Sequence, residues 1–106
     1  MKFFTPSYLY QKTIAITLPT CSTDGTPVHT NIAIGTTVKI AVSCKGYIDN
    51  NGTIMFINDV NSNKFVRCTV YNNSYSTSSE RNKLHISNAQ VSASGKQGYI
   101  TIQYTK

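Results

Sequence analysis

Hydrophobic and polar side chains alternate along most of the chain from residue 12 onward, and this two-residue period is typical of β-strands. The first strand is predicted over residues 12–18, and a second, shorter one over residues 28–34. The inward-facing side chains are Ile14, Ile16 and Leu18 in the first strand and Ile100, Ile102 and Tyr104 in the last.

The longest predicted strand covers residues 36–48 and leads into a hairpin. Its inward-facing side chains are expected to be Val38, Ile40, Val42 and Cys44. Asn51-Gly52 follows, and Asn-Gly between two β-patterned segments is a strong hairpin signal because both residue types tolerate positive φ. Residues 53–58 should therefore pair with the long strand. Residues 64–71 should continue the same sheet as the third strand of a meander.

The segments that remain carry weaker patterns. Residues 72–82 are polar and lack a period, so they are predicted to form a loop, and two short strands are expected at residues 84–86 and 91–93. Seven or eight short strands with frequent turns predict an all-β, single-domain antiparallel β-sandwich. The alternative is a small five-stranded barrel of the oligonucleotide-binding type with extra strands, because both folds use the same alternating strands.

Composition and length agree with this fold class. Valine and isoleucine together number 18, against 8 for leucine and alanine, and β-branched side chains disfavour helices. The chain has 106 residues, which is enough for one core and short for two domains. We predict an N-terminal apolar arm at residues 1–11 and an all-β domain at residues 12–106.

The predicted arm holds five large hydrophobic side chains without a regular period: Phe3, Phe4, Tyr8, Leu9 and Tyr10. Such a segment is too irregular for a core strand, and it is too apolar to remain in water. We expect the arm to dock, either as an added edge strand on its own domain or on a neighbouring copy. The predicted partner is therefore a protein subunit of an assembly, or the chain itself as an oligomer.

The chain offers little material for catalysis. Its two histidines, His29 and His85, stand alone in strand patterns, and neither belongs to a recognisable catalytic motif. Only four acidic residues are present, and three of them lie in predicted turns, where aspartate is expected for backbone reasons. We therefore expect a protein that is not an enzyme and that needs no cofactor.

The three cysteines have no metal-binding spacing, so no metal site is expected. Cys44 and Cys68 lie on the hydrophobic faces of predicted strands and could be neighbours across a sandwich. No signal peptide is recognised, so we expect these thiols to be reduced. No apolar stretch approaches the length of a membrane span, and no membrane partner is expected. The predicted location is a virion or the host cytoplasm.

The net charge of +6 suggests a polyanion as an alternative partner. If residues 36–48 and 64–71 are adjacent strands, one face mixes cations with flat rings, the arrangement that binds single-stranded nucleic acid. The residues of this possible nucleic-acid face are Lys39, Lys45, Tyr47, Phe65, Arg67 and Tyr71. In their β patterning, residues 36–72 resemble the opening strands of an oligonucleotide-binding barrel. The competing interpretation is that these rings pack beneath a second sheet or a neighbouring subunit.

A β domain rich in threonine, serine and asparagine, with few charges and an adhesive arm, resembles small decoration, head or fibre-associated proteins of viruses, particularly phages. We therefore predict a non-enzymatic, virion-associated structural module that binds neighbouring protein subunits. Two alternatives stay open. One is a single-stranded nucleic-acid-binding protein that uses the face described above. The other is a small enzyme or secreted effector whose site carries no recognisable motif.

Overall fold

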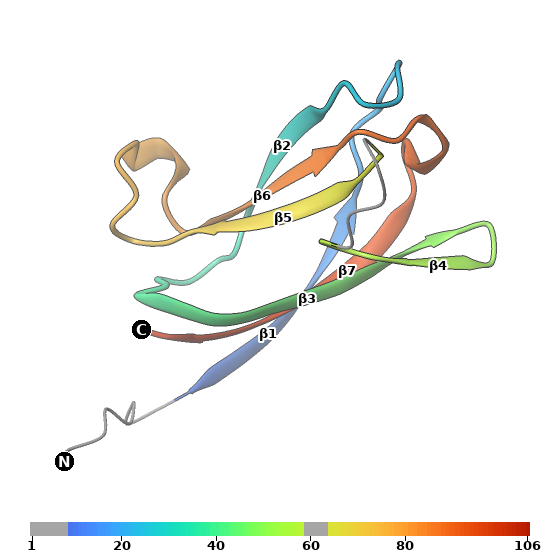
Figure 1. Cartoon of the computed structure of the whole chain (residues 1–106). Coiled ribbons are helices and arrows are strands. Elements are labelled where there is room, and N and C mark those ends of the chain that lie inside the picture. Colours follow the sequence, from blue (N-terminus) through green and yellow to red (C-terminus); the bar gives the residue numbers. More distant parts are fainter. Residues whose placement is uncertain (1–8, 59–63) are drawn as a thin grey trace, which may run out of the picture.

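The computed structural model of the chain describes residues 9–58 and 64–106. These residues form two antiparallel sheets that pack face to face (Figure 1). Sheet A has the strand order β1-β7-β3-β4, and sheet B has the order β2-β6-β5. The elements are β1 (Tyr10–Thr17), β2 (Val28–Ala33), β3 (Ile40–Asn50), β4 (Thr53–Phe56), β5 (Val66–Tyr71), the short 3-10 helix η1 (Ser78–Glu80), β6 (Lys83–Asn88), the 3-10 helix η2 (Val91–Ala93) and β7 (Gln97–Thr105).

The fold is an all-β sandwich, which confirms the main prediction from the sequence. The alternative, a closed barrel, is wrong because the strands form two separate sheets with open edges. The edges of sheet A are β1 and β4, and those of sheet B are β2 and β5.

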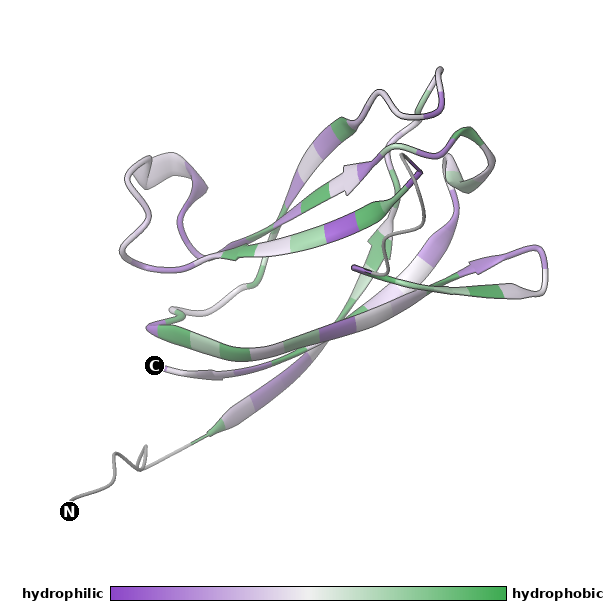
Figure 2. Cartoon of the chain, in the orientation of Figure 1, coloured by the Kyte–Doolittle hydropathy of each residue, from purple (hydrophilic) through white to green (hydrophobic). Residues whose placement is uncertain are grey.

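The core consists of the side chains that the two sheets turn toward each other. Figure 2 shows hydrophobic and hydrophilic residues alternating along strands such as β5, as expected when one face is buried and the other is not. The completely buried aliphatic side chains in the strands of the core are Ile48, Leu84, Ile86, Ile100 and Ile102. The inward residues predicted for the first and last strands are confirmed, because all of them belong to this core or pack against it.

The prediction for the longest strand is wrong in two respects. The strand begins at Ile40, and its register against β7 shifts between Ala41 and Ser43. Val42 is therefore the extra residue of a β-bulge, which reverses the inward and outward sides of the strand at that point. As a result, Ile40 is 44% exposed and Val42 is 54% exposed, whereas Ala41 packs against the core.

The predicted hairpin is confirmed and the predicted meander is wrong. β3 and β4 pair through a turn in which Asn51 and Gly52 both have positive φ. β5, however, pairs with β6 and belongs to sheet B, so the chain crosses from one sheet to the other after β4. Asn58 stabilises this crossing, because its side-chain oxygen accepts a hydrogen bond from the backbone N–H of Cys68 at 2.9 Å.

Other segments refine the predicted organisation. Residues 91–93 form η2 instead of a strand. The polar segment 72–82 is a loop that contains η1, and it is tied to the rest of the domain by Asn82, whose side chain accepts a hydrogen bond from the N–H of Val38. β1 begins at Tyr10, so the last two residues of the predicted arm belong to sheet A.

Two glycines allow β3 and β7 to approach closely on the core side of sheet A. Gly98 lies opposite Ile48, and Gly46 lies opposite Ile100. A Cβ atom on Gly46 would lie 2.5 Å from the carbonyl oxygen of Tyr99, and one on Gly98 would overlap the carbonyl oxygen of Tyr47. Both positions therefore require glycine, because any side chain would collide with the backbone of the neighbouring strand.

We predict that Gly98→Ala lowers the free energy of unfolding by about 2 to 3 kcal/mol, because the added methyl group must push β3 away from β7. Urea denaturation followed by circular dichroism measures the change. Gln97→Ala is the control, since residue 97 is exposed on the same strand and its substitution should cost less than about 0.5 kcal/mol. Equal stabilities of the two variants would contradict this account.

Candidate interaction surfaces

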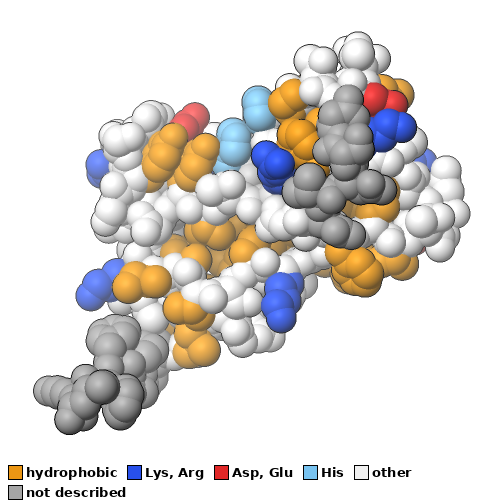
Figure 3. Space-filling model, viewed as in Figure 1, with side chains coloured by type: hydrophobic (Ala, Val, Ile, Leu, Met, Phe, Trp, Pro, Cys, Tyr) orange, Lys and Arg blue, Asp and Glu red, His pale blue; other side chains and the backbone are white. Residues whose placement is uncertain are grey.

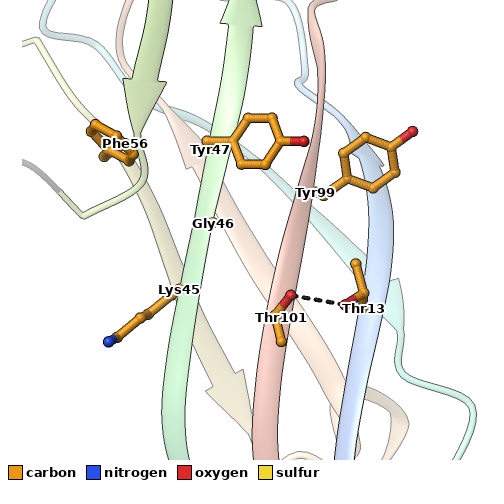
Figure 4. Close-up of a pocket in the computed structure, with 7 residues that line it drawn as sticks. All are labelled: Thr13, Lys45, Gly46, Tyr47, Phe56, Tyr99 and Thr101. Atoms are coloured by element: carbon orange, nitrogen blue, oxygen red, sulfur yellow. Dashed lines mark hydrogen bonds between the residues drawn. The ribbon is translucent and has the colours of Figure 1, made fainter.

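The outer face of sheet A carries a row of three aromatic side chains, which we call the aromatic row: Phe56 on β4, Tyr47 on β3 and Tyr99 on β7. Tyr47 is the cross-strand partner of both other residues, so the three rings lie side by side across the sheet (Figure 4). They are 66%, 40% and 49% exposed, respectively. Large exposed rings gathered in one place are typical of binding surfaces.

A polar row runs parallel to the aromatic row, one step along the strands. It consists of Lys45, Thr101 and Thr13, and the two threonine hydroxyls are hydrogen-bonded to each other at 2.8 Å (Figure 4). The two rows together line a shallow hollow of about 560 Å³. The rings of Tyr47 and Tyr99 are tilted by 49°, with 5.9 Å between their centroids. This surface combines an apolar centre with hydroxyl and ammonium groups at its margin.

Opposite charges flank the aromatic row on β3. Lys45 precedes Tyr47 by two residues and Asp49 follows it by two, and all three are exposed on the outer face. One oxygen of Asp49 accepts a hydrogen bond from the N–H of Gly52 at 2.9 Å, which holds the carboxylate at the start of the hairpin. Ile54, the cross-strand partner of Asp49, is 49% exposed and extends the apolar area.

The outer face of sheet B carries a different arrangement, a column of four stacked rings. Tyr75 stacks on Tyr71 with 3.9 Å between centroids, Tyr71 stacks on His85 at 5.0 Å, and His85 stacks on His29 at 5.1 Å. Figure 3 shows the two histidines, in pale blue, adjacent at the surface. Desolvation raises the pKa of Tyr71 above its ordinary value, and the hydrogen bond with Tyr75 adds to this effect. Because the rings cover one another, the column presents ring edges to solvent, and only the two end rings have a face free of the column.

Each of the two histidines is hydrogen-bonded to a polar side chain on an adjacent strand. His85 Nδ1 lies 2.6 Å from Asn31 Oδ1, and His29 Nδ1 lies 2.7 Å from Ser87 Oγ. A serine hydroxyl beside a histidine is one element of nucleophilic catalysis, but Ser87 is only 8% exposed, because its neighbours on the outer face of sheet B cover it. Among the described residues, no three side chains of histidine, cysteine, aspartate or glutamate gather to form a metal site.

The six residues of the predicted nucleic-acid face do not form one face. Lys45 and Tyr47 lie on the outer side of sheet A, whereas Arg67 and Tyr71 lie on the outer side of sheet B. The reason is that β5 does not neighbour β3. Phe65 precedes β5, and the guanidinium of Arg67 lies 4.1 Å from its ring centroid. Lys39 precedes β3, and its backbone N–H donates to the carbonyl of Thr105.

The predicted arm is described only at its end. Tyr10 begins β1 and packs against the core, with its ring stacked on that of Tyr104 at 5.7 Å. Leu9 is 52% exposed. The other arm residues named above, Phe3, Phe4 and Tyr8, lie outside the described residues, so docking of the arm stays a prediction.

Several surface residues escaped the sequence analysis. Phe56 lies in an uninterrupted hydrophobic run, which hides its outward orientation, and Tyr99 was a ring on the polar side of the last strand. The outward orientation of Tyr99 could have been found from the sequence, because this large ring is out of phase with the inward residues of its strand. The column of His29 and His85 could not be found in this way, because it requires knowledge that β2 and β6 are neighbours.

Comparison of the chain with protein-family models, with curated proteins and with solved structures gives no match. In the part of the chain that the structure describes, no helix has the length and apolar character needed to cross a membrane.

We predict that Tyr71→Thr lowers the free energy of unfolding by about 1 to 2 kcal/mol, because the central ring loses its contacts with both Tyr75 and His85. Thermal and urea denaturation measure the loss. Thr69→Ala, at the next outward position on β5, is the matched control and should change stability by less than about 0.5 kcal/mol. A Tyr71 variant as stable as this control would mean that the column contributes nothing to the fold.

Proposed function

We propose that this protein is a non-enzymatic interaction module that associates with a second copy of itself through the outer face of sheet A. The observation that carries the proposal is the aromatic row, three rings each at least 40% exposed on a sheet face that no other described element covers. Aromatic residues at the centre of a face, with polar groups around them, are characteristic of protein interfaces. Tyrosine is also among the residues whose truncation costs an interface most.

The charges on this face are arranged so that it complements itself. A two-fold axis lying between two such sheets and running along the aromatic row places each ring against the same ring of the second copy. This axis also reverses the strand direction, so Lys45 of one copy faces Asp49 of the other. Such isologous contacts are the commonest form of homo-oligomer. Two sheets can pack in this aligned way with a separation of about 10 Å.

The balance of forces favours the rings over the charges as the source of affinity. Burial of an aromatic side chain contributes on the order of 2 kcal/mol, whereas an exposed ion pair contributes about 0.2 to 1 kcal/mol. The Lys45–Asp49 pairs therefore select the orientation of the two copies. The net charge of +6 on each copy opposes association weakly at low ionic strength, and added salt screens this repulsion.

We further propose that the larger assembly is a virus particle, in which this chain acts as a decoration, head or fibre-associated subunit. The support is the abundance of threonine, serine and asparagine, the scarcity of charge and the apolar segment at residues 1–11. The genes that flank the coding sequence test this placement. Neighbours encoding capsid or tail proteins are expected, and a neighbourhood of metabolic genes would refute it.

We predict that the chain forms dimers whose stability depends on the aromatic row. In sedimentation equilibrium, Phe56→Ser combined with Tyr47→Ser should raise the dissociation constant at least about a hundredfold, because two anchor residues are lost from each copy. Tyr71→Ser, a tyrosine on the other sheet, is the control and should leave association unchanged. A wild-type chain that stays monomeric up to millimolar concentration would overturn the proposal.

The orientation of the two copies is tested by reversing charges. Lys45→Glu or Asp49→Lys alone should raise the dissociation constant roughly tenfold, because each creates two like-charged contacts. The double variant should restore affinity, since the pair is then exchanged. Lys83→Glu on sheet B changes the net charge as Lys45→Glu does, and it should have no effect in salt that screens the repulsion between copies. Failure of the double variant to recover affinity would contradict the two-fold arrangement.

The nucleic-acid alternative is separated by its dependence on salt. Binding of a labelled single-stranded oligonucleotide that weakens steeply with added salt would indicate phosphate contacts and would favour that alternative. Association through the aromatic row should instead persist when salt is raised.

A further inference from the structure

Two cysteines from different sheets meet inside the sandwich. Cys44 on β3 and Cys68 on β5 lie with their sulfur atoms 3.6 Å apart, although 24 positions separate them in the sequence. The two cysteines are therefore neighbours across the sandwich, the arrangement that the sequence left open. Both thiols are free in the structure.

Two local features of the fold bring these two cysteines close together. The bulge at Val42 shifts the register of β3, after which Cys44 faces inward opposite Ile102. On the other sheet, Asn58 fixes the start of β5 by accepting a hydrogen bond from the N–H of Cys68. The backbone that carries Cys44 is therefore positioned by its pairing with β7, and the backbone that carries Cys68 is positioned by Asn58.

The two thiols differ in a way that suits thiol–disulfide exchange. Cys44 is half-buried and Cys68 is 7% exposed, so a small molecule reaches Cys44 first. The hydrogen bond between the thiols lowers the pKa of Cys44, whereas the same hydrogen bond and burial raise the pKa of Cys68. The thiolate is the attacking species in such exchange, and Cys44 is therefore the group that reacts with an incoming oxidant.

We propose that Cys44 and Cys68 form an oxidative modification site at which a low-molecular-weight disulfide, such as oxidised glutathione, closes a covalent bond between the two sheets. The Cys44 thiolate attacks one sulfur of the oxidant and forms a mixed disulfide, and one glutathione thiolate leaves. The Cys68 thiol then gives up its proton and attacks the Cys44 sulfur, and the second glutathione leaves. The protein loses two electrons and two protons, and one oxidised glutathione becomes two reduced molecules.

Cys21 provides a control within the same chain. It is buried, and its thiol donates hydrogen bonds to the carbonyl oxygens of Thr23 and Thr26 at 3.1 and 3.3 Å. It lies in the segment between β1 and β2, where its hydrogen-bond partners are Thr23, Thr26 and Ser94. It should therefore remain a free thiol under conditions that oxidise the pair.

The chain of 106 residues, reduced and then treated with oxidised glutathione, tests the proposal. Of the three thiols titrated under denaturing conditions, one should remain, and the intact mass should fall by two hydrogen atoms. Peptide mapping should place the bond between residues 44 and 68. The oxidised form should melt roughly 10 °C or more above the reduced form, because the bond restricts the unfolded chain.

Single substitutions separate the steps. Cys21→Ser should oxidise and gain stability as the wild type does. Cys68→Ser should stop at a glutathione adduct on Cys44. Cys44→Ser should form no adduct and no disulfide at Cys68, because the attacking thiolate is missing. Because serine could weaken the core, each variant is also compared with the reduced wild type by urea denaturation. Three free thiols after treatment, a bond that involves Cys21, a disulfide between two molecules or a melting temperature lowered by oxidation would each overturn the proposal.

Discussion

The architecture depends on the apolar contact between the inner faces of the two sheets. Ile48, Ile100 and Ile102 from sheet A meet Leu84 and Ile86 from sheet B, and all are withdrawn from water. Backbone hydrogen bonds hold strands within each sheet but supply little between the sheets, so burial of these side chains is what joins them. This contact also determines which residues remain outside, and the aromatic row and the ring column are consequences of it.

Much of this architecture follows from side-chain alternation, and the errors have physical causes. The inward faces of β1, β5 and β7 and the hairpin at Asn51 could be derived because each depends on neighbours in sequence. The bulge at Val42 could not, since an inserted residue leaves the hydrophobic pattern of the strand almost unchanged. The sheet to which β5 belongs depends on packing between distant segments, and a local pattern holds no information about it.

The same distinction between local pattern and strand order applies to the candidate surfaces. Outward orientation was correctly derived for Lys45, Tyr47, Arg67 and Tyr71, but their grouping on one face was wrong because the chain changes sheets between them. Orientation is a property of one strand, whereas a surface is a property of several strands in a particular order. For this reason the two outer faces, one with exposed ring surfaces and one with rings that cover each other, became distinguishable only with the strand order in hand.

The brevity of β4 has a consequence for strand addition at this edge of sheet A. As an open edge of sheet A, it exposes main-chain groups that an incoming strand could extend, which is how fibrils grow. With four residues, however, it offers too few such groups for a lasting ladder, and the positive-φ turn beside it ends the extended backbone. Strand addition at this edge is thereby disfavoured, which favours the proposed contact through the broad face of the sheet over growth from β4.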